Sequence, residues 1–361
     1  MKILIVQDFL RSGGTERQSV LLANAWAAAG HPTTLLTFRP GGALVGTVAK
    51  NVSRRTLQPF DVGLDWLAPG LIAATRRAAP DIILCMGRMA NCYGASLQNA
   101  LPACRVIATM RTGKPLPALF RRSLQRVGHV VANSAEARDA LVSRYFVSRQ
   151  KISVIHNSLV FPPVTTLRRN DALRAHYGAT DSTNVLLCVA MFRPEKNQRE
   201  LVEIMAGLPT SCDWQLWLAG DGPARAACED LVSRKKLGAR VKFTGFHANP
   251  SALYCAADLA VHASWSEALS NFLIEAQAHG LPAVAYQAQG IEECFIPGQT
   301  GWAIARNDRT AFRSELLRQF GPGATERNVI AEKARTFARE TFDPERQVAA
   351  YLNLFSQIVA P

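Results

Sequence analysis

Short apolar runs of strand length alternate with helix-length segments along the chain, and this alternation limits its fold more than any other feature. In the first half, strands are predicted at residues 3–6, 33–38, 81–85, 105–109, 130–132 and 152–155. Helices are predicted between them, near residues 15–29, 66–79, 90–100, 115–127 and 135–145. Strands joined through helices run parallel and are covered on both faces, so we expect a doubly wound α/β domain.

The same pattern starts again in the second half. Strands are predicted at residues 184–189, 214–218, 240–243, 259–262 and 282–286, and helices near 198–207, 271–279, 325–340 and 344–359. Residues 160–170, with two adjacent prolines, are interpreted as a linker. A length of 361 residues also suits two domains better than one hydrophobic core. We therefore predict two α/β domains, residues 1–160 and 171–343.

Several classes of protein are disfavoured by composition. No apolar run reaches the roughly 20 residues of a spanning helix, and the N-terminal apolar run is too short for a signal peptide. The eight cysteines show no CxxC pair and no zinc spacing, so we expect reduced core residues in a cytoplasmic protein. The third glycine of the dinucleotide fingerprint is missing, which counts against a nicotinamide enzyme.

The net charge of +13 belongs entirely to the first half. Residues 1–157 hold 20 Lys and Arg against 7 Asp and Glu, whereas residues 158–361 hold 21 of each. Such a domain suits an anionic partner, namely a phosphorylated acceptor, a membrane surface or nucleic acid. Nucleic acid is disfavoured because the basic segments lack interleaved aromatics and any known binding motif. The alternative is a charge that serves solubility alone.

The predicted helix at residues 115–127 is basic and amphipathic. Five apolar residues share one face, and three arginines lie off it: Leu116, Leu119, Phe120, Leu124 and Val127, with Arg121, Arg122 and Arg126. A helix of this kind can rest on anionic lipid at the inner face of the plasma membrane. The alternative is a packed helix with a solvated basic face.

Two glutamates eight positions apart, Glu267 and Glu275, lie around the start of a predicted helix. Ser270 or Asn271 is a suitable N-cap, and Gly280 a suitable stop. Glu267 then precedes the helix and Glu275 lies within it. The helix N-terminus favours a phosphate, while the carboxylates can accept hydrogen bonds from sugar and ribose hydroxyls. The alternative is a capped surface helix with two ordinary glutamates.

Two cations, Arg193 and Lys196, follow the predicted strand at residues 184–189 and precede a helix. This arrangement suits a diphosphate, whose charge the cations and the helix dipole can neutralise without a metal. No Asp-x-Asp sequence occurs in the chain. We therefore expect neither a metal nor a cofactor.

The glutamate pair resembles the E-x7-E signature of the retaining glycosyltransferases of family 4. The family form is Glu-Gly-Leu-Pro-x-x-x-x-Glu-Ala, and here Ala268 and Ser270 replace its Gly and Pro. The resemblance covers essentially the whole chain. It implies the GT-B architecture, in which two Rossmann-like domains face a central cleft, with an acceptor-binding first domain and a nucleotide-sugar-binding second domain. It also implies that the last helix, residues 344–361, packs back on the first domain.

The resemblance implies roles for individual residues of the second half. Lys196 matches the family lysine, whereas Met191 stands where the family arginine often lies, and Arg193 is the candidate substitute. Glu267, Lys196 and Arg193 are the implied catalytic residues. The implied donor-binding residues are Glu275, Gly13, Gly14, Ala268, Leu269, Ser270, Asn271, Gly220, Gly222, Phe246 and His247.

In the first half, candidate residues follow the predicted strands. The loop after the first strand resembles the family segment Gly-Gly-x-Glu-Arg and contributes Glu16 as an acceptor-side candidate. Arg88, Arg111 and Lys114 are further acceptor-side candidates, and Arg111 lies near the place of a histidine found in many relatives. The alternatives are a glycine turn that needs a positive φ and solvated loop cations.

The resemblance implies a glycosyltransferase that moves a sugar from a UDP-sugar or GDP-sugar to a saccharide or lipid-linked acceptor, in lipopolysaccharide or other surface polysaccharide synthesis. Two alternatives share the same features. One is a protein that binds a nucleotide sugar without transferring it, and the other is a sugar-nucleotide 2-epimerase of the same fold.

Overall fold

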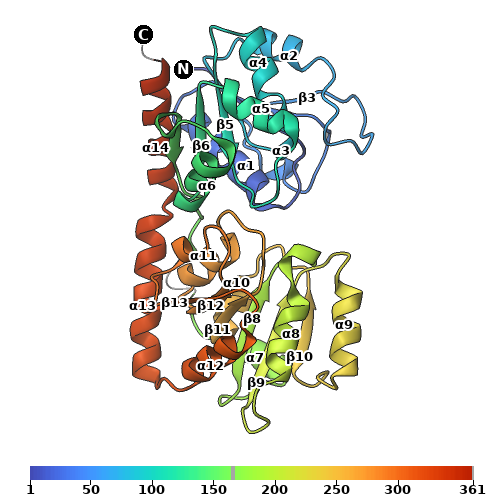
Figure 1. Cartoon of the computed structure of the whole chain (residues 1–361), viewed down its shortest axis with the longest axis vertical. Coiled ribbons are helices and arrows are strands. Elements are labelled where there is room, and N and C mark those ends of the chain that lie inside the picture. Colours follow the sequence, from blue (N-terminus) through green and yellow to red (C-terminus); the bar gives the residue numbers. More distant parts are fainter. Residues whose placement is uncertain (164–166, 360–361) are drawn as a thin grey trace. The chain divides into compact units, whose positions relative to one another are not determined.

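A computed structural model describes residues 1–163 and 167–359. Residues 164–166 of the predicted linker and residues 360–361 of the predicted last helix lie outside the described residues. The chain forms two compact units (Figure 1). The first comprises Met1–Ser158 together with the segment that starts at Pro344, and the second comprises Leu159–Asp343.

The first unit is built on a seven-stranded parallel sheet in the order β3-β2-β1-β4-β5-β6-β7. Its strands are β1 (Ile3–Gln7), β2 (Thr33–Thr37), β3 (Ser53–Thr56), β4 (Ile82–Cys85), β5 (Arg105–Met110), β6 (His129–Ala132) and β7 (Ile152–Val154). The strand order reverses between β1 and β4. In doubly wound sheets, ligands bind beyond the carboxyl ends of the strands at such a point.

Seven helices of the first unit are described. They are α1 (Gly14–Ala28), α2 (Leu71–Ala78), α3 (Arg88–Cys92), α4 (Gly94–Ala100), α5 (Ala118–Arg126), α6 (Ala135–Tyr145) and α14 (Pro344–Val359). Helix α14 lies in this unit because its aromatic side chains pack on α1. The Trp26 ring lies 5.6 Å from that of Tyr351 and 5.2 Å from that of Phe355.

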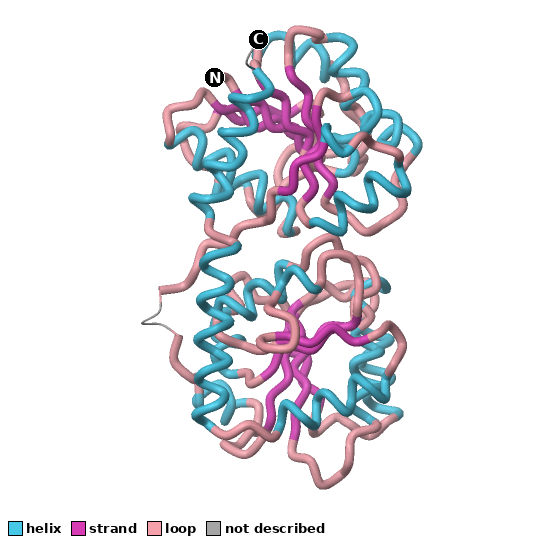
Figure 2. The backbone as a smooth tube through the Cα atoms, turned by 60° about the vertical axis from the view of Figure 1, so that its left-hand side comes forward, coloured by secondary structure: helices cyan, strands magenta, loops and turns pink. Residues whose placement is uncertain are grey.

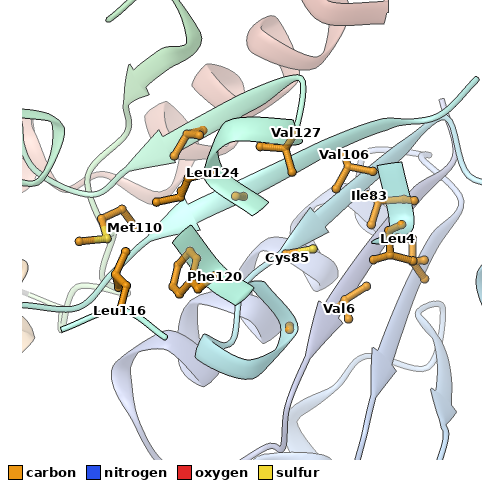
Figure 3. Packing of buried hydrophobic residues seen from close by; sticks show 14 of the residues in the cluster. Leu4, Val6, Ile83, Cys85, Val106, Met110, Leu116, Phe120, Leu124 and Val127 are labelled. Carbon is orange, nitrogen blue, oxygen red and sulfur yellow. The ribbon is translucent and has the colours of Figure 1, made fainter. Parts of the chain in front are cut away.

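Helix α5 is packed through most of its predicted apolar face. Phe120 and Leu124 are fully buried, in the same cluster as Leu4, Ile83 and Val106 of the sheet (Figure 3). Leu119 differs from the prediction, because 60% of its surface is exposed. The buried face is therefore narrower than the sequence indicated, and one apolar side chain stands on the basic face of α5.

Two other predicted helices of the first unit differ from the structure. The helix expected at residues 66–79 begins at Leu71, because the Gln58 side chain donates hydrogen bonds to the carbonyl groups of Leu64 and Leu67 and holds that stretch as a loop. The helix expected at residues 90–100 is divided into α3 and α4 at Tyr93. The Tyr93 hydroxyl donates to the carbonyl of Trp66 in the same loop.

The second unit contains a six-stranded parallel sheet in the order β10-β9-β8-β11-β12-β13. Its strands are β8 (Asn184–Val189), β9 (Trp214–Ala219), β10 (Val241–Gly245), β11 (Leu259–His262), β12 (Ala283–Tyr286) and β13 (Gly301–Ile304). Its described helices are α7 (Asp171–His176), α8 (Gln198–Ala206), α9 (Arg225–Arg234), α10 (Ser251–Ala256), α11 (Asn271–Ala278), α12 (Arg309–Phe320) and α13 (Ala324–Thr341).

Helices lie on both sides of the strands in each unit (Figure 2). Two parallel sheets with this cover confirm the predicted α/β class. In the second unit the strand order reverses between β8 and β11. The loops that follow these two strands carry Lys196 and Glu267, so the fold places both at the topological switch point. No helix within the described residues has both the length and the apolar character to span a bilayer.

Candidate functional site

Backbone contacts join the two loops at the switch point of the second unit. The loop after β8 ends in a short 3-10 turn, Pro194–Lys196, and the loop after β11 runs to the N-terminus of α11. The Glu195 carbonyl accepts hydrogen bonds from the Ser264 hydroxyl at 2.9 Å and from the Trp265 amide at 3.1 Å. Because both bonds end on one carbonyl oxygen, the loops hold a fixed spacing.

This spacing brings Lys196 and Glu267 into direct contact. The Lys196 ammonium lies 2.5 Å from Oε1 of Glu267, and Nε2 of His262 lies 2.8 Å from the same oxygen. Glu267 is 8% exposed and His262 is 1% exposed, whereas the Lys196 side chain remains 25% exposed. The cation therefore covers a buried carboxylate and still reaches solvent.

Opposing effects determine the charge of Glu267. Burial alone would raise the pKa of its carboxyl group, but the Lys196 ammonium and the His262 hydrogen bond outweigh burial and lower this pKa to about 2. Glu267 is therefore an anion at neutral pH. An ionised carboxylate accepts hydrogen bonds and donates none, which suits a ligand that presents hydroxyl groups.

The family arginine is absent, and the structure shows what surrounds its position. Met191 is 39% exposed, and its sulfur accepts a hydrogen bond from Nε of Arg193 at 2.8 Å. Arg193 is exposed. Its guanidinium is thus held beside the position of the family arginine, and its role as a substitute stays a prediction.

Helix α11 carries Glu275, as the sequence predicted, and Gly280 follows it with a φ of +82°. Oε2 of Glu275 accepts a hydrogen bond of 2.7 Å from the hydroxyl of Tyr254, a buried residue of α10. The ring of His279 stacks on Tyr254 at 4.6 Å between centroids. Tyr254 and His279 therefore fix the orientation of the Glu275 carboxylate.

The candidates in the α11 approach differ in exposure. Ala268, Leu269 and Ser270 are buried, and Asn271 is half-buried. Ser270 is the N-cap residue, but its side chain makes no capping hydrogen bond. After Gly290 the chain forms a short 3-10 turn, Glu292–Cys294. A Cβ at Gly290 would lie 2.0 Å from the Ala268 carbonyl oxygen, so glycine lets this turn approach the loop before α11.

Two further loops of the second unit contain predicted donor-binding residues. Gly220 has a φ of +133° and Gly222 one of +149°, and a Cβ at either position would overlap a carbonyl oxygen of the loop after β8. These glycines pack the loop after β9 against the loop that carries Lys196. Phe246 is 59% exposed after β10, and Nε2 of His247 lies 3.0 Å from the Thr244 carbonyl. Binding roles for these residues remain predictions.

The glycines of the first unit lie at the start of α1. Gly13 has a φ of −74°, so the alternative of a turn that needs a positive φ is wrong at this position. A Cβ at Gly13 would lie 2.5 Å from Oε2 of Glu16, so the absent side chain leaves room for that carboxylate. Gly14 is the first residue of the helix.

Loops at the other strand ends hold the acceptor-side candidates. Arg88 is exposed and donates to the Pro115 carbonyl at 2.6 Å. The backbone amide of Lys114 donates to the Thr112 hydroxyl. Arg111 donates to the side chains of Asn157 and Tyr351 within the first unit. Arg111 therefore supports the local structure, and its acceptor-side role stays a prediction.

Asp8 lies at the switch point of the first unit and was not predicted. Its carboxylate accepts the backbone amides of Met89 at 3.0 Å and Ala90 at 2.5 Å, and it packs so closely on Gly87 that a Cβ there would overlap it. Burial raises the pKa of Asp8 to about 7, against the effect of the two amides. Asp8 thus holds the α3 start that carries Arg88.

His262 and Tyr254 are the residues near the glutamate pair that sequence reasoning missed. Each lies in a buried apolar segment, and its contact to a glutamate is fixed only by the fold. No cluster of three or more His, Cys, Asp or Glu side chains that could hold a metal ion occurs among residues 1–163 and 167–359.

Both halves of the chain match described glycosyltransferase families. Residues 12–159 match the family described as "Glycosyltransferase Family 4", and residues 183–320 match "Glycosyl transferases group 1". The first match contains the Gly13-Gly14 loop, and the second contains Lys196, Glu267 and Glu275. The matches thus include the loops at the switch points of both sheets.

Curated relatives agree with this assignment. Lipopolysaccharide core biosynthesis glycosyltransferase LpsE from Rhizobium meliloti (strain 1021) is 24% identical over 96% of this chain and 97% of its own. N-acetyl-alpha-D-glucosaminyl L-malate synthase from Bacillus anthracis is 29% identical over 52% of this chain. The second alignment covers 49% of that relative, so this chain matches about half of its length.

Solved structures share the fold over the whole chain. The crystal structure of HepE from Anabaena in complex with UDP superposes with a TM-score of 0.81 at 22% sequence identity, over 99% of this chain and 100% of that chain. An identity this low shows the fold alone, and the matched families supply the rest. The chain belongs to the family 4 glycosyltransferases of GT-B fold.

Proposed function

We propose that this chain is a retaining glycosyltransferase that moves a sugar from a nucleoside-diphosphate sugar to a saccharide or lipid-linked acceptor. The observation that carries the proposal is the contact between Lys196 and Glu267 at the switch point of the second unit. Helix α11, which follows the loop of Glu267, carries the oriented Glu275 one turn from its start. A partly exposed cation beside the Glu267 carboxylate, with a second fixed carboxylate on the helix that follows, matches the charge and hydroxyl pattern of a nucleotide sugar.

Each part of the donor has a chemically suitable partner in the second unit. Lys196 and Arg193 are cations, and the N-terminus of α11 is the positive end of the helix dipole, so all three suit the diphosphate. Glu267 suits hydroxyl groups of the transferred sugar, and Glu275 suits the diol of the ribose, because ionised carboxylates are strong hydrogen-bond acceptors. Since the solved relative HepE binds UDP, a UDP-sugar is the first donor to test.

The chemistry that these residues supply is electrostatic. As the bond between the sugar and the diphosphate breaks, negative charge grows on the leaving diphosphate, and the ammonium of Lys196 stabilises that charge. Arg193 adds a second cation without need for a metal. We assign no carboxylate as a nucleophile, and the retaining outcome follows from family membership.

The first unit is the proposed acceptor domain. Residues 1–157 carry the whole excess of positive charge, which favours an anionic acceptor. The name of the relative LpsE assigns it to lipopolysaccharide core biosynthesis. We therefore propose that the acceptor of this chain is a saccharide or lipid-linked intermediate of surface polysaccharide synthesis. Glu16, Arg88 and Lys114 are the side chains proposed to contact it.

A thermal-shift panel of UDP-, GDP-, ADP- and dTDP-sugars tests donor binding. We expect one nucleotide class to raise the melting temperature, since a ligand that binds only the native state stabilises it. Glu275→Ala should reduce the shift, whereas Glu332→Ala, at a 70% exposed side chain of α13, should leave it unchanged. A panel without any shift, or an unchanged shift in Glu275→Ala, would contradict the proposed donor site.

Donor turnover then separates transfer from the two alternatives. A transferase releases the nucleoside diphosphate faster when acceptor extract is added. An epimerase releases it together with an altered sugar and needs no acceptor, and a binding protein releases none. Met191 in place of the family arginine, and Arg111 near the place of the histidine found in many relatives, are the features that favour the binding protein. If Arg193 serves as the second cation, the wild type should turn over the donor without the Met191→Arg substitution.

Peripheral membrane contact is proposed for α5. Leu119 is exposed on the same side of the helix as Arg122 and Arg126, by their spacing of three and seven residues. Each basic residue near an anionic bilayer contributes about 1 kcal/mol to binding. The double variant Arg122→Glu and Arg126→Glu should therefore lose co-sedimentation with phosphatidylglycerol-containing vesicles.

The matched control for this experiment is the charge-equivalent pair Arg199→Glu and Arg234→Glu in the second unit. It should sediment as the wild type does. Vesicles of phosphatidylcholine alone should bind neither protein, and added salt should weaken binding because it screens surface charge. Equal loss in both double variants would assign the effect to net charge and not to α5.

A further inference from the structure

The strongest observation that the proposed function leaves unused is the buried imidazole of His262. It lies at the end of β11 with 1% of its surface exposed, and its Nε2 is 2.8 Å from Oε1 of Glu267. Its other nitrogen, Nδ1, is buried and has no hydrogen-bond partner in the described part of the chain. The ring also packs against Phe272, at 5.5 Å between centroids.

A purely structural role does not explain this residue well. A buried polar group without a partner costs stability, so an apolar side chain would suit the same position better if packing were the only requirement. The one hydrogen bond that His262 makes ends on the buried carboxylate proposed to contact the donor sugar. The arrangement is therefore explained by what His262 does to Glu267.

Both hydrogen bonds to Glu267 within the described residues end on Oε1, one from His262 and one from Lys196. Lys196 is the proposed partner of the donor diphosphate, so a bound donor competes for its ammonium. His262 cannot be drawn away in this manner, because it is buried and held by Phe272. His262 is therefore the hydrogen-bonding side chain that stays with the Glu267 carboxylate when Lys196 turns to the ligand.

We propose that His262 is a positioning residue of the donor site. Its Nε2–H holds Oε1 of Glu267, which leaves Oε2 oriented to accept hydroxyl groups of the transferred sugar. This inference rests on the proposed function and concerns the sugar part of the donor alone. The diphosphate and the nucleoside contact other residues, so their binding does not depend on His262.

Two amide variants of similar polarity test the inference. In His262→Gln the side-chain amide reaches about as far as Nε2 of the imidazole and still donates to Glu267. In His262→Asn the amide lies near the position of Nδ1 and does not reach. Each variant is titrated by calorimetry with the sugar nucleotide that binds most tightly in the UDP-, GDP-, ADP- and dTDP-sugar panel, and with the matching nucleoside diphosphate.

We expect His262→Asn to weaken binding of the sugar nucleotide by about tenfold or more, since a hydrogen bond to a charged group is lost. Binding of the nucleoside diphosphate should change by less than about threefold. His262→Gln should restore most of the sugar-nucleotide affinity. Melting curves of the unliganded variants check that both are folded, and the paired design keeps the comparison valid if both are equally destabilised.

Three results would overturn the inference. The first is equal affinity of His262→Asn and wild type for the sugar nucleotide. The second is an equal loss for the sugar nucleotide and the nucleoside diphosphate, and the third is a His262→Gln variant no better than His262→Asn. Failure of the proposed function is distinguishable, because Lys196→Met and Glu275→Ala would then leave donor binding unchanged as well.

Discussion

Lys196→Met is expected to lower the kcat of donor turnover by about 10²- to 10³-fold, the cost typical of losing one group that stabilises the charge of a transition state. The ammonium lies beside Glu267 at the switch point, and the Lys196 side chain is 25% exposed, so it can reach a leaving diphosphate. Methionine keeps the length and the apolar stem of the side chain. Loss of activity in this variant would therefore report the missing charge.

Lys235→Met is the matched control, because Lys235 lies in the same unit, is 41% exposed and pairs with the half-buried Glu203, away from Glu267. It should keep wild-type turnover. Lys196→Arg should retain part of the activity, since it restores the charge with a different shape. Near-normal kcat in Lys196→Met, with the protein folded by circular dichroism, would remove the basis of the proposed mechanism.

Lys196→Met should also change the stability of the protein in acid. The pKa of Glu267 is held below its unfolded value of about 4.5, so the ionised carboxylate stabilises the native state above that pH, and this contribution is lost as pH falls through the range from 4.5 toward 2. Removing the Lys196 charge raises the native pKa. The difference between the unfolded and native pKa values is then smaller, so the variant should lose less stability than the wild type as the pH falls from 4.5 toward 2.

The sequence predicted α11 and its two glutamates because the signals are local. A run of apolar residues between a polar N-cap region and Gly280 defines the helix, and Glu267 and Glu275 fall at fixed positions around it. The sequence also predicted that Lys196 lies in the loop after the strand at residues 184–189, which is β8. By contrast, nothing in the sequence links His262 to Glu267, because a lone histidine in an apolar strand is typical of many buried strands.

Most strands with apolar sequences were predicted, but the exposed strand β3 and the short strand β13 were missed. Strand β3, Ser53–Thr56, is exposed along its length and lies at the sheet edge, so it has no apolar signal. Helix α12, Arg309–Phe320, buries only Phe312 and Leu316, and its charged residues hide the helical period. Hydrogen bonds and packing between distant segments determine whether such strands and helices form, so short-range sequence patterns do not predict them.

Arg174 makes such tertiary hydrogen bonds. It lies in the short helix α7, which sequence reasoning missed. Its side chain is 2% exposed, and Nη1 lies 2.8 Å from both the Asp258 carboxylate and the Ala256 carbonyl. Nη2 donates to the carbonyl groups of Thr180 and Thr183. One guanidinium therefore joins α7, the loop before β8 and the turn before β11.

Arg174→Met is expected to lower the free energy of unfolding of the second unit by about 3–5 kcal/mol, because it leaves the Asp258 charge without its main partner in a poorly solvated place. For a unit of this size the melting temperature should fall by roughly 10 °C. Thermal and urea melts, followed by tryptophan fluorescence, measure the change. A fall below about 1 kcal/mol would show that the buried pair contributes little.

Arg169→Met supplies the control for charge removal. Arg169 lies five residues earlier and pairs with Asp171 and Asp181, which are 69% and 100% exposed, so solvent screens the interaction and the loss should stay below about 1 kcal/mol. The double variant Arg174→Met and Asp258→Leu should recover part of the stability, since no charge is then left buried. Recovery cannot be complete, because the carbonyl groups of Ala256, Thr180 and Thr183 lose their donor in either variant. The difference between the single and double variants therefore separates the cost of a stranded carboxylate from the cost of unpaired backbone.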